Sequence, residues 1–295
     1  MNLDPIKTLF LALLQGVTEL FPISSLGHTV ILPPLFGWGD LEHDRHFLPL
    51  IVALHLGTAI ALILYFWRDW WKFLLTFINI ARTRRVSQGT EEWVSVMVVV
   101  GTIPAGLLGL ILQKPLEKLF SSPLITAAFL VVNGSMLFLA EGLRRRAEAR
   151  LNGAHPKERE AFFRPLASLS WKEAVIVGLA QALALIPGFS RSGASLAGGL
   201  MVRLTHEDAA RFSFLLGTPI ILAAAVLKVP ELFHLDSSTL LLVFLGMVLA
   251  GVAAFLSTHF LMRYFEKGRL DPFAYYCWGG GLVYLILLLI VVRPA

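Results

Sequence analysis

The chain has 295 residues, of which 56% are hydrophobic and only 15% are charged. Soluble domains carry about 25% charged residues, so this composition excludes a water-soluble enzyme, and it equally excludes a disordered chain. The single cysteine, Cys277, rules out an internal disulfide and any CxxC metal or redox site. The formal net charge of +5 fits lysine and arginine in membrane-protein loops, so we expect no nucleic-acid partner.

Six apolar stretches are long enough to cross a bilayer, which takes about 20 helical residues. They are Phe47–Trp67, Trp93–Gln113, Pro123–Leu143, Ala209–Leu227, Leu240–Met262 and Pro272–Val292. Two more apolar stretches, Pro5–Leu35 and Trp171–Val202, are interrupted near their middles. Because neither arm of either stretch can cross, we expect two re-entrant helix–loop–helix hairpins whose tips lie at membrane depth.

The basic residues predict how these segments are oriented. Eighteen of the 25 lysines and arginines fall in or beside the loops that follow the first, third and fifth predicted spans and the second hairpin. Six lie on the opposite side, and Arg191 alone lies inside a hairpin tip. Since cytoplasmic loops carry an excess of positive charge, this asymmetry places both termini outside the cytoplasm.

The two halves of the chain, residues 1–150 and 151–295, repeat small and polar residues in the same order. The matching residues are Gln15 and Gln181, Pro22 and Pro187, Ser24 and Ser190, Ser25 and Arg191, Gly27 and Gly193, and Leu56-Gly57-Thr58 and Leu216-Gly217-Thr218. Each half holds one hairpin and three spans, and because three is odd the second copy is expected to be inverted. We therefore expect an all-α polytopic membrane protein of two inverted-topology repeats in one membrane domain, with the binding site where the hairpin tips meet.

The first tip carries groups that suit nucleophilic or general-base chemistry. Gln15 and Glu19 are four residues apart, on one helical face. A carboxylate in an apolar segment costs about 2.5–3.5 kcal/mol to insert, which makes Glu19 a functional candidate. Ser24, Ser25 and His28 follow, and Ser25 and His28 share a face if a helix resumes at Ser24. The structural alternative is a capped helix break with a hydrogen-bonded histidine.

The second tip has the features of an anion site. A helix N-terminus there gathers free N–H groups and the positive end of the helix dipole. Arg191 adds a guanidinium that can bind two phosphate oxygens, and Ser190 and Ser192 add donors. Gly188 and Gly193 let the backbone approach a ligand closely. The structural alternative is that Arg191 only pairs with the carboxylate of the first tip.

Two further polar residues, His55 and Glu141, lie on predicted spans. Either could line a cavity, and packing or interfacial roles explain them equally well.

The two tips also resemble a known family. Residues 15–28 read QGVTELFPISSLGH, which resembles the (E/Q)xxxE and PxSSxGH signature of the bacterial undecaprenyl-diphosphate phosphatases, also called bacitracin-resistance proteins. Residues 187–193 read PGFSRSG, which resembles the PGxSRSG motif of the same family. Length, number of spans and motif placement are similar along essentially the whole chain.

The resemblance implies that the chain removes one phosphate from a C55 polyprenyl diphosphate, which recycles the cell-wall lipid carrier and confers bacitracin resistance. It implies that Glu19 is a catalytic carboxylate, as a metal ligand or a base. Ser25 or His28 would be the nucleophile or its activator, and water is a third candidate nucleophile. The residues that would bind substrate are Arg191, Gln15, Ser24, Gly188, Ser190, Ser192 and Gly193.

The resemblance also implies a divalent cation, Mg²⁺ or Ca²⁺, a multi-pass location in the bacterial plasma membrane with the site reached from outside, and a homodimer. Departures are mild: Gln15 stands where many members carry Glu, and Ser195 where Thr is frequent. Mg²⁺ can still use Glu19 with substrate phosphates, since it commonly takes one or two carboxylates. The alternative from another class is a transporter or flippase of polyprenyl phosphate lipids, which has little use for Ser25 and His28.

Overall fold

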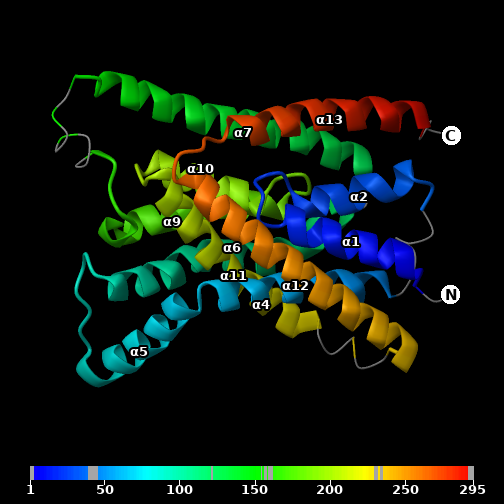
Figure 1. Cartoon of the computed structure of the whole chain (residues 1–295), viewed down its shortest axis with the longest axis horizontal. Helices are drawn as coiled ribbons and strands as arrows, with labels where there is room; N and C mark the ends of the chain where they lie inside the picture. Colours follow the sequence, from blue (N-terminus) through cyan, green and yellow to red (C-terminus); the bar gives the residue numbers. More distant parts are fainter. Residues whose placement is uncertain are drawn as a thin grey trace.

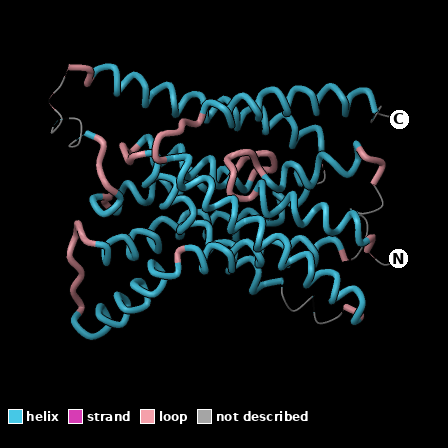
Figure 2. Tube along the Cα trace, viewed as in Figure 1, coloured by secondary structure: helices cyan, strands magenta, loops and turns pink. Residues whose placement is uncertain are grey.

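The computed structural model describes residues 3–38, 46–120, 122–153, 155, 158, 162–228, 232 and 235–291. Within these ranges the chain forms eleven α-helices and two short 3-10 helices, and the β-bridge between Arg164 and Leu204 is isolated (Figures 1 and 2). The α-helices are α1 (Pro5–Thr18), α2 (Ser25–Leu35), α4 (Phe47–Tyr65), α5 (Trp67–Thr83), α6 (Glu91–Phe120), α7 (Pro123–Arg150), α9 (Trp171–Ala182), α10 (Arg191–Met201), α11 (His206–Lys228), α12 (Ser237–Phe265) and α13 (Asp271–Val291). The 3-10 helices are η1 (Leu166–Ser168) and η2 (Leu183–Leu185). The predicted all-α architecture is confirmed.

Five helices, α6, α7, α11, α12 and α13, are long and apolar enough to cross a membrane. Each covers one of the predicted spans and extends beyond it at one or both ends, and α13 covers its span as far as Val291, the last described residue. The helices α7 and α13 pack side by side along one edge of the bundle (Figure 1). The chain is therefore built as a multi-pass membrane protein.

The first predicted span ends earlier than expected. Helix α4 stops at Tyr65, and α5 leaves it at an angle of 81°. The basic residues after this span predict a loop, whereas α5 is a helix with Phe73 and Thr76 buried and Trp67 and Trp71 more than half exposed. A helix with one buried face and exposed aromatic residues suits the membrane–water interface. The pair α4 and α5 counts as a sixth candidate span if taken together.

The two interrupted stretches form helix–loop–helix hairpins, as predicted. Helices α1 and α2 have 14 and 11 residues, and α9 and α10 have 12 and 11. All four are shorter than the roughly 20 residues that a crossing needs. Their connecting segments, 19–24 and 186–190, lie in the interior of the bundle (Figure 2).

Each hairpin packs on a long helix from the other half of the chain. Helix α1 lies against α12, and α9 lies against α6. Glycines permit both contacts, because a Cβ on Gly16 would collide with the carbonyl oxygen of Ala250, and one on Gly178 with that of Gly101. This exchange of partners brings the two connecting segments together.

Candidate active site

Both hairpin tips restart their second helix with the same cap. The side chain of Ser24 accepts a hydrogen bond from the backbone N–H of Gly27, and that of Ser190 accepts one from Gly193. A serine N-cap satisfies one of the N–H groups that a helix start leaves free. The chain reaches these caps through left-handed backbone, at Ser24 itself (φ 69°) and at Gly188 (φ 94°).

Asn133 of α7 joins the two tips. It is fully buried, its Nδ2 donates to the carbonyl of Pro22 at 3.0 Å, and its Oδ1 accepts from the backbone N–H of Ser190 at 3.0 Å. The hydroxyl of Ser192 adds a third link by donating to the carbonyl of Phe21 at 2.9 Å. These contacts fix the position of one tip relative to the other.

Glu19 lies where the tips meet, and four side chains converge on its carboxylate. Its Oε2 accepts from the hydroxyl of Ser25 at 2.5 Å and from the amide Nε2 of Gln15 at 2.9 Å. Its Oε1 accepts from Nη2 of Arg191 at 2.9 Å. The Nε2 of His55, on α4, lies 3.5 Å from Oε2.

His55 is held in place by its own helix. Its Nδ1–H donates to the carbonyl of Ile51 at 2.8 Å, which leaves Nε2 facing the carboxylate of Glu19. Glu19 therefore lies between the imidazole of His55 and the guanidinium of Arg191.

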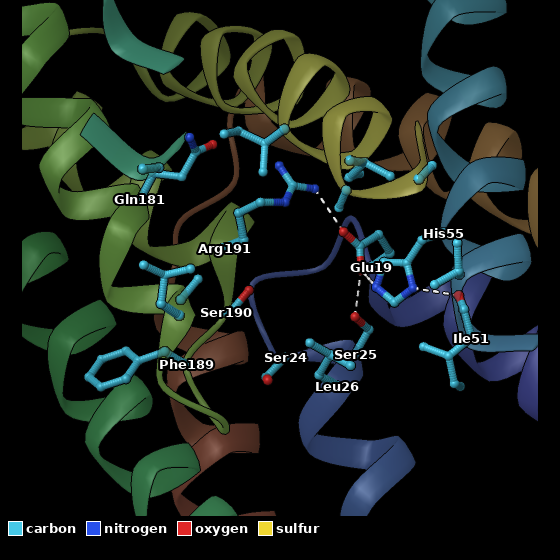
Figure 3. A pocket seen from close by; sticks show the side chains of 18 residues that line it. Glu19, Ser24, Ser25, Leu26, Ile51, His55, Gln181, Phe189, Ser190 and Arg191 are labelled. Atoms are coloured by element: carbon cyan, nitrogen blue, oxygen red, sulfur yellow. Dashed lines mark hydrogen bonds and ion pairs between the residues drawn. The ribbon is translucent and has the colours of Figure 1, made fainter. Parts of the chain in front are cut away.

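A cavity of about 340 Å³ opens beside these groups (Figure 3). Its polar lining residues are Glu19, Ser24, Ser25, His55, Gln181, Ser190 and Arg191. Its apolar lining includes Ile51, Val52, Ala105, Leu185, Ile220 and Ala224. A polar end that carries a guanidinium, set against apolar walls, suits an anion attached to a hydrocarbon chain.

The structure brings five of the predicted site residues to this cavity: Glu19, Ser24, Ser25, Ser190 and Arg191. Gln15 lies behind Glu19, fully buried. The alternative in which Arg191 only pairs with Glu19 accounts for their contact but not for the adjoining cavity. A buried ion pair is also weak support for stability, because apolar residues of similar volume often serve as well.

His28 does not share the cavity, contrary to what the spacing of Ser25 and His28 suggested. Its Nδ1–H donates to the carbonyl of Ser24 at 2.7 Å, and its Nε2 accepts from the hydroxyl of Tyr276 at 2.7 Å. The ring is 1% exposed and stacks on Tyr276. The imidazole beside the carboxylate is that of His55 instead.

Three residues expected to bind substrate occupy packing positions. A Cβ on Gly188 would collide with the carbonyl of Thr126 on α7, and one on Gly193 would lie 3.1 Å from Pro22 of the other tip. The hydroxyl of Ser192 is already used on the first tip. These residues let the tips approach each other.

The sequence motifs leave the role of His55 open and give Gln181 no role. A signal for each was present. His55 lies directly before the repeated Leu-Gly-Thr element, and Gln181 is the counterpart of Gln15.

The oxygen atoms beside Glu19 fit a hard cation. Among the described residues, no three His, Cys, Asp or Glu side chains converge, which excludes a closed cage of such ligands in that part of the chain. Mg²⁺ and Ca²⁺ need fewer protein ligands when substrate and water complete the shell. Besides the carboxylate of Glu19, the buried amide oxygen of Gln15 has no hydrogen-bond partner and could supply a second ligand.

Comparison with known proteins identifies the family. The family described as "Bacitracin resistance protein BacA" matches residues 8–283. "Undecaprenyl-diphosphatase" of Acidiphilium cryptum is 44% identical over 97% of this chain and 99% of its own length. "Undecaprenyl-diphosphatase" of Granulibacter bethesdensis is 46% identical over 95% of this chain and 96% of its own, and "Undecaprenyl-diphosphatase 2" of Burkholderia thailandensis is 48% identical over 92% and 93%. The chain belongs to the BacA family of bacitracin-resistance proteins.

Proposed function

We propose that this chain hydrolyses undecaprenyl diphosphate to undecaprenyl phosphate and inorganic phosphate, and thereby confers the bacitracin resistance for which its family is named. Full-length relatives called undecaprenyl-diphosphatase support the substrate and the reaction. The observation that carries the mechanism is the contact of 2.5 Å between the hydroxyl of Ser25 and Glu19, with Arg191 on the other carboxylate oxygen.

Ser25 is the nucleophile. Its oxygen attacks the terminal phosphorus, its proton passes to Glu19, and the bond from that phosphorus to the bridging oxygen breaks, so that undecaprenyl phosphate leaves. Glu19 gives this proton to the departing undecaprenyl phosphate and is a carboxylate again. Water then attacks the phosphoserine, and Glu19 takes a proton from the water and passes it to the oxygen of Ser25 as that oxygen's bond to phosphorus breaks. Inorganic phosphate is released and Ser25 is restored. A hydroxyl already bonded to a buried carboxylate needs no rearrangement to begin this sequence.

Arg191 supplies positive charge. Phosphoryl transfer depends mainly on positioning and on stabilising the charge of the transferring group, and a guanidinium does both. Because Glu19 is 7% exposed, water screens these interactions weakly. His55 orients Glu19 from the side opposite Arg191 (Figure 3).

His28 is a positioning residue. Its Nδ1–H holds the carbonyl of Ser24, the residue before the nucleophile. The bond to Tyr276 ties the start of α2 to α13. His28 thus fixes the backbone from which Ser25 projects.

A divalent cation would be held by Glu19 and the free amide oxygen of Gln15. When bound, it would neutralise negative charge on the diphosphate. Loss of phosphate release in chelator, and its return with Mg²⁺ or Ca²⁺, tests this part of the proposal.

The hairpins are re-entrant, and the two halves are inverted repeats. Support comes from their matching caps and from the exchanged packing of α1 on α12 and α9 on α6.

In the proposed orientation of the chain in the membrane, both termini and the opening of the cavity lie outside the cytoplasm. In support, basic loops meet at one end of the bundle, where Arg145 pairs with Asp271 and Arg269 with Glu148. Single cysteines introduced into these loops should react with an impermeant thiol reagent only after the membrane is opened. Cys277 is buried, so the native thiol gives little background.

The decisive experiment measures phosphate release from undecaprenyl diphosphate by the purified protein in detergent, with Ser25→Ala as the matched variant. Release by the wild type and none by the variant supports the proposal, and a trapped phosphate on Ser25 identifies the nucleophile. Binding without turnover, unchanged in Ser25→Ala and His28→Ala, would instead identify a carrier or flippase.

A further inference from the structure

One polar side chain on the cavity wall has no role in the steps above. Gln181, in the last turn of α9, is only 2% exposed, and neither its amide nitrogen nor its amide oxygen has a hydrogen-bond partner. It lines the cavity. Burying an amide without a partner costs free energy, and most such groups in proteins are paired.

The counterpart of Gln181 in the first hairpin shows what the amide lacks. Gln15 donates to the carboxylate of Glu19, four residues further along its helix. The residue four positions after Gln181 is Leu185. The second hairpin thus repeats the amide donor but provides no anion for it.

Arg191 has a free donor as well. Its Nη2 is used on Glu19, whereas its Nη1 is buried without a hydrogen-bond partner. The guanidinium lies against Gly217, where any Cβ would collide with it. Figure 3 shows Glu19 and Gln181 on opposite sides of Arg191.

We propose that Gln181 and the free Nη1 of Arg191 bind the phosphate that stays attached to the lipid. This inference rests on the proposed function. Ser25 and Glu19 define where the terminal phosphate reacts, so the inner phosphate lies on the other side of the guanidinium, beside Gln181. An amide N–H and a guanidinium N–H both donate to phosphate oxygens. Leu185, on the same wall, then contacts the first isoprene units.

The test compares the two reaction products as inhibitors, because each contains a different one of the two phosphates of the substrate. Undecaprenyl phosphate retains the inner phosphate, and inorganic phosphate derives from the terminal one. We expect Gln181→Leu to weaken inhibition by undecaprenyl phosphate about tenfold, the usual scale for a hydrogen bond to a charged group, and to leave inhibition by inorganic phosphate unchanged. Gln181→Glu keeps the size but places a carboxylate beside the phosphate, and should weaken the lipid product more.

Gln88→Leu is the matched control, because Gln88 is exposed in the segment between α5 and α6. Gln181→Leu removes no hydrogen bond from the free protein, so its unfolding temperature should equal or exceed that of the wild type. A residue needed only for folding would lower the unfolding temperature.

Unchanged binding of undecaprenyl phosphate in Gln181→Leu, or an equal loss of inorganic phosphate binding, would overturn the inference. Direct binding of undecaprenyl phosphate to wild type and variant separates this result from failure of the proposed function. If the wild type released no phosphate, the enzyme assignment would fail, while a selective binding loss in Gln181→Leu would still support the site.

Discussion

The two hairpin tips share one backbone design and carry different chemistry. Ser24 and Ser190 cap their helices in the same way, through the glycine three residues on. The next residue is Ser25 in the first tip and Arg191 in the second, and both contact Glu19. One design thus presents a nucleophile from one side of the carboxylate and a cation from the other. The comparison teaches that the local fold sets where a group points, and that the residue placed there sets its function.

The largest loss of activity should come from substituting Ser25, the first residue of α2. Ser25→Ala removes the attacking oxygen, so kcat for phosphate release should fall by a factor of about 10⁴ to 10⁶. The hydroxyl of Ser192, one residue beyond the equivalent position, donates to Phe21 of the other tip. Ser192→Ala should therefore lower the unfolding temperature and retain most activity. Equal losses in the two variants would show that the tips do not divide their roles in this way.

The equivalent position of the second tip should give the next effect. Arg191→Ala removes the cation that stabilises the transferring phosphoryl group, and kcat/KM should fall by a factor of about 10³ to 10⁵. Arg191→Lys should recover little of this, because an ammonium cannot donate to Glu19 and to phosphate from two fixed nitrogens. Near-normal kcat/KM in the lysine variant would rule out the arrangement in which Nη2 binds Glu19 while Nη1 binds phosphate.

The two histidines extend the comparison to the surroundings of the first tip. His55→Ala removes a neighbour of Glu19, and kcat should fall about tenfold, equivalent to about 1.4 kcal/mol. His259, exposed on α12, gives the matched control His259→Ala, which should keep the wild-type kcat. A normal kcat for His55→Ala would mean that Arg191 and Gln15 suffice to orient the carboxylate.

The smallest loss of activity should be that of His28→Asn, in which an amide replaces the hydrogen-bond donor that His28→Ala removes. His28→Ala removes the side-chain donor to the carbonyl of Ser24, which keeps only the backbone N–H of residue 28 at 3.3 Å, and it also removes the partner of the Tyr276 hydroxyl. These losses should cost about 1–3 kcal/mol of stability. His28→Asn places an amide donor near the former Nδ1 and should restore much of the lost activity and stability. A histidine that transfers protons in the reaction would not be replaced by asparagine, so failure of this rescue returns His28 to the list of catalytic candidates.

Composition and spacing predicted most of the fold. Five spans, both helix breaks and the meeting of Arg191 with Glu19 follow from apolar length, from Pro22 and Pro187, and from isolated charges in apolar segments. Helix α5 was missed because its charged residues suggested a loop, although they occupy one face of an amphipathic helix.

The rotation of individual helices could not be predicted. Helix α4 is apolar on all sides, so its sequence does not show that His55 faces the cavity. The direction of His28 depends on the left-handed backbone at Ser24, which L-residues rarely adopt and which the motif does not reveal. The sequence does not show that the amide of Gln181 lacks a hydrogen-bond partner, because this depends on which side chains surround it in the fold.

The pairing of Glu19 with Arg191 has a consequence for selectivity. Before any lipid enters, the guanidinium already has a counter-ion of its own, so an incoming anion gains only what it offers beyond that carboxylate. Chloride or another singly charged ion gains little beside this pair, whereas a diphosphate brings several charges and can bind the free Nη1. The ion pair of the empty site thus lowers the affinity for small, singly charged anions of the surrounding water more than it lowers the affinity for multiply charged lipid headgroups.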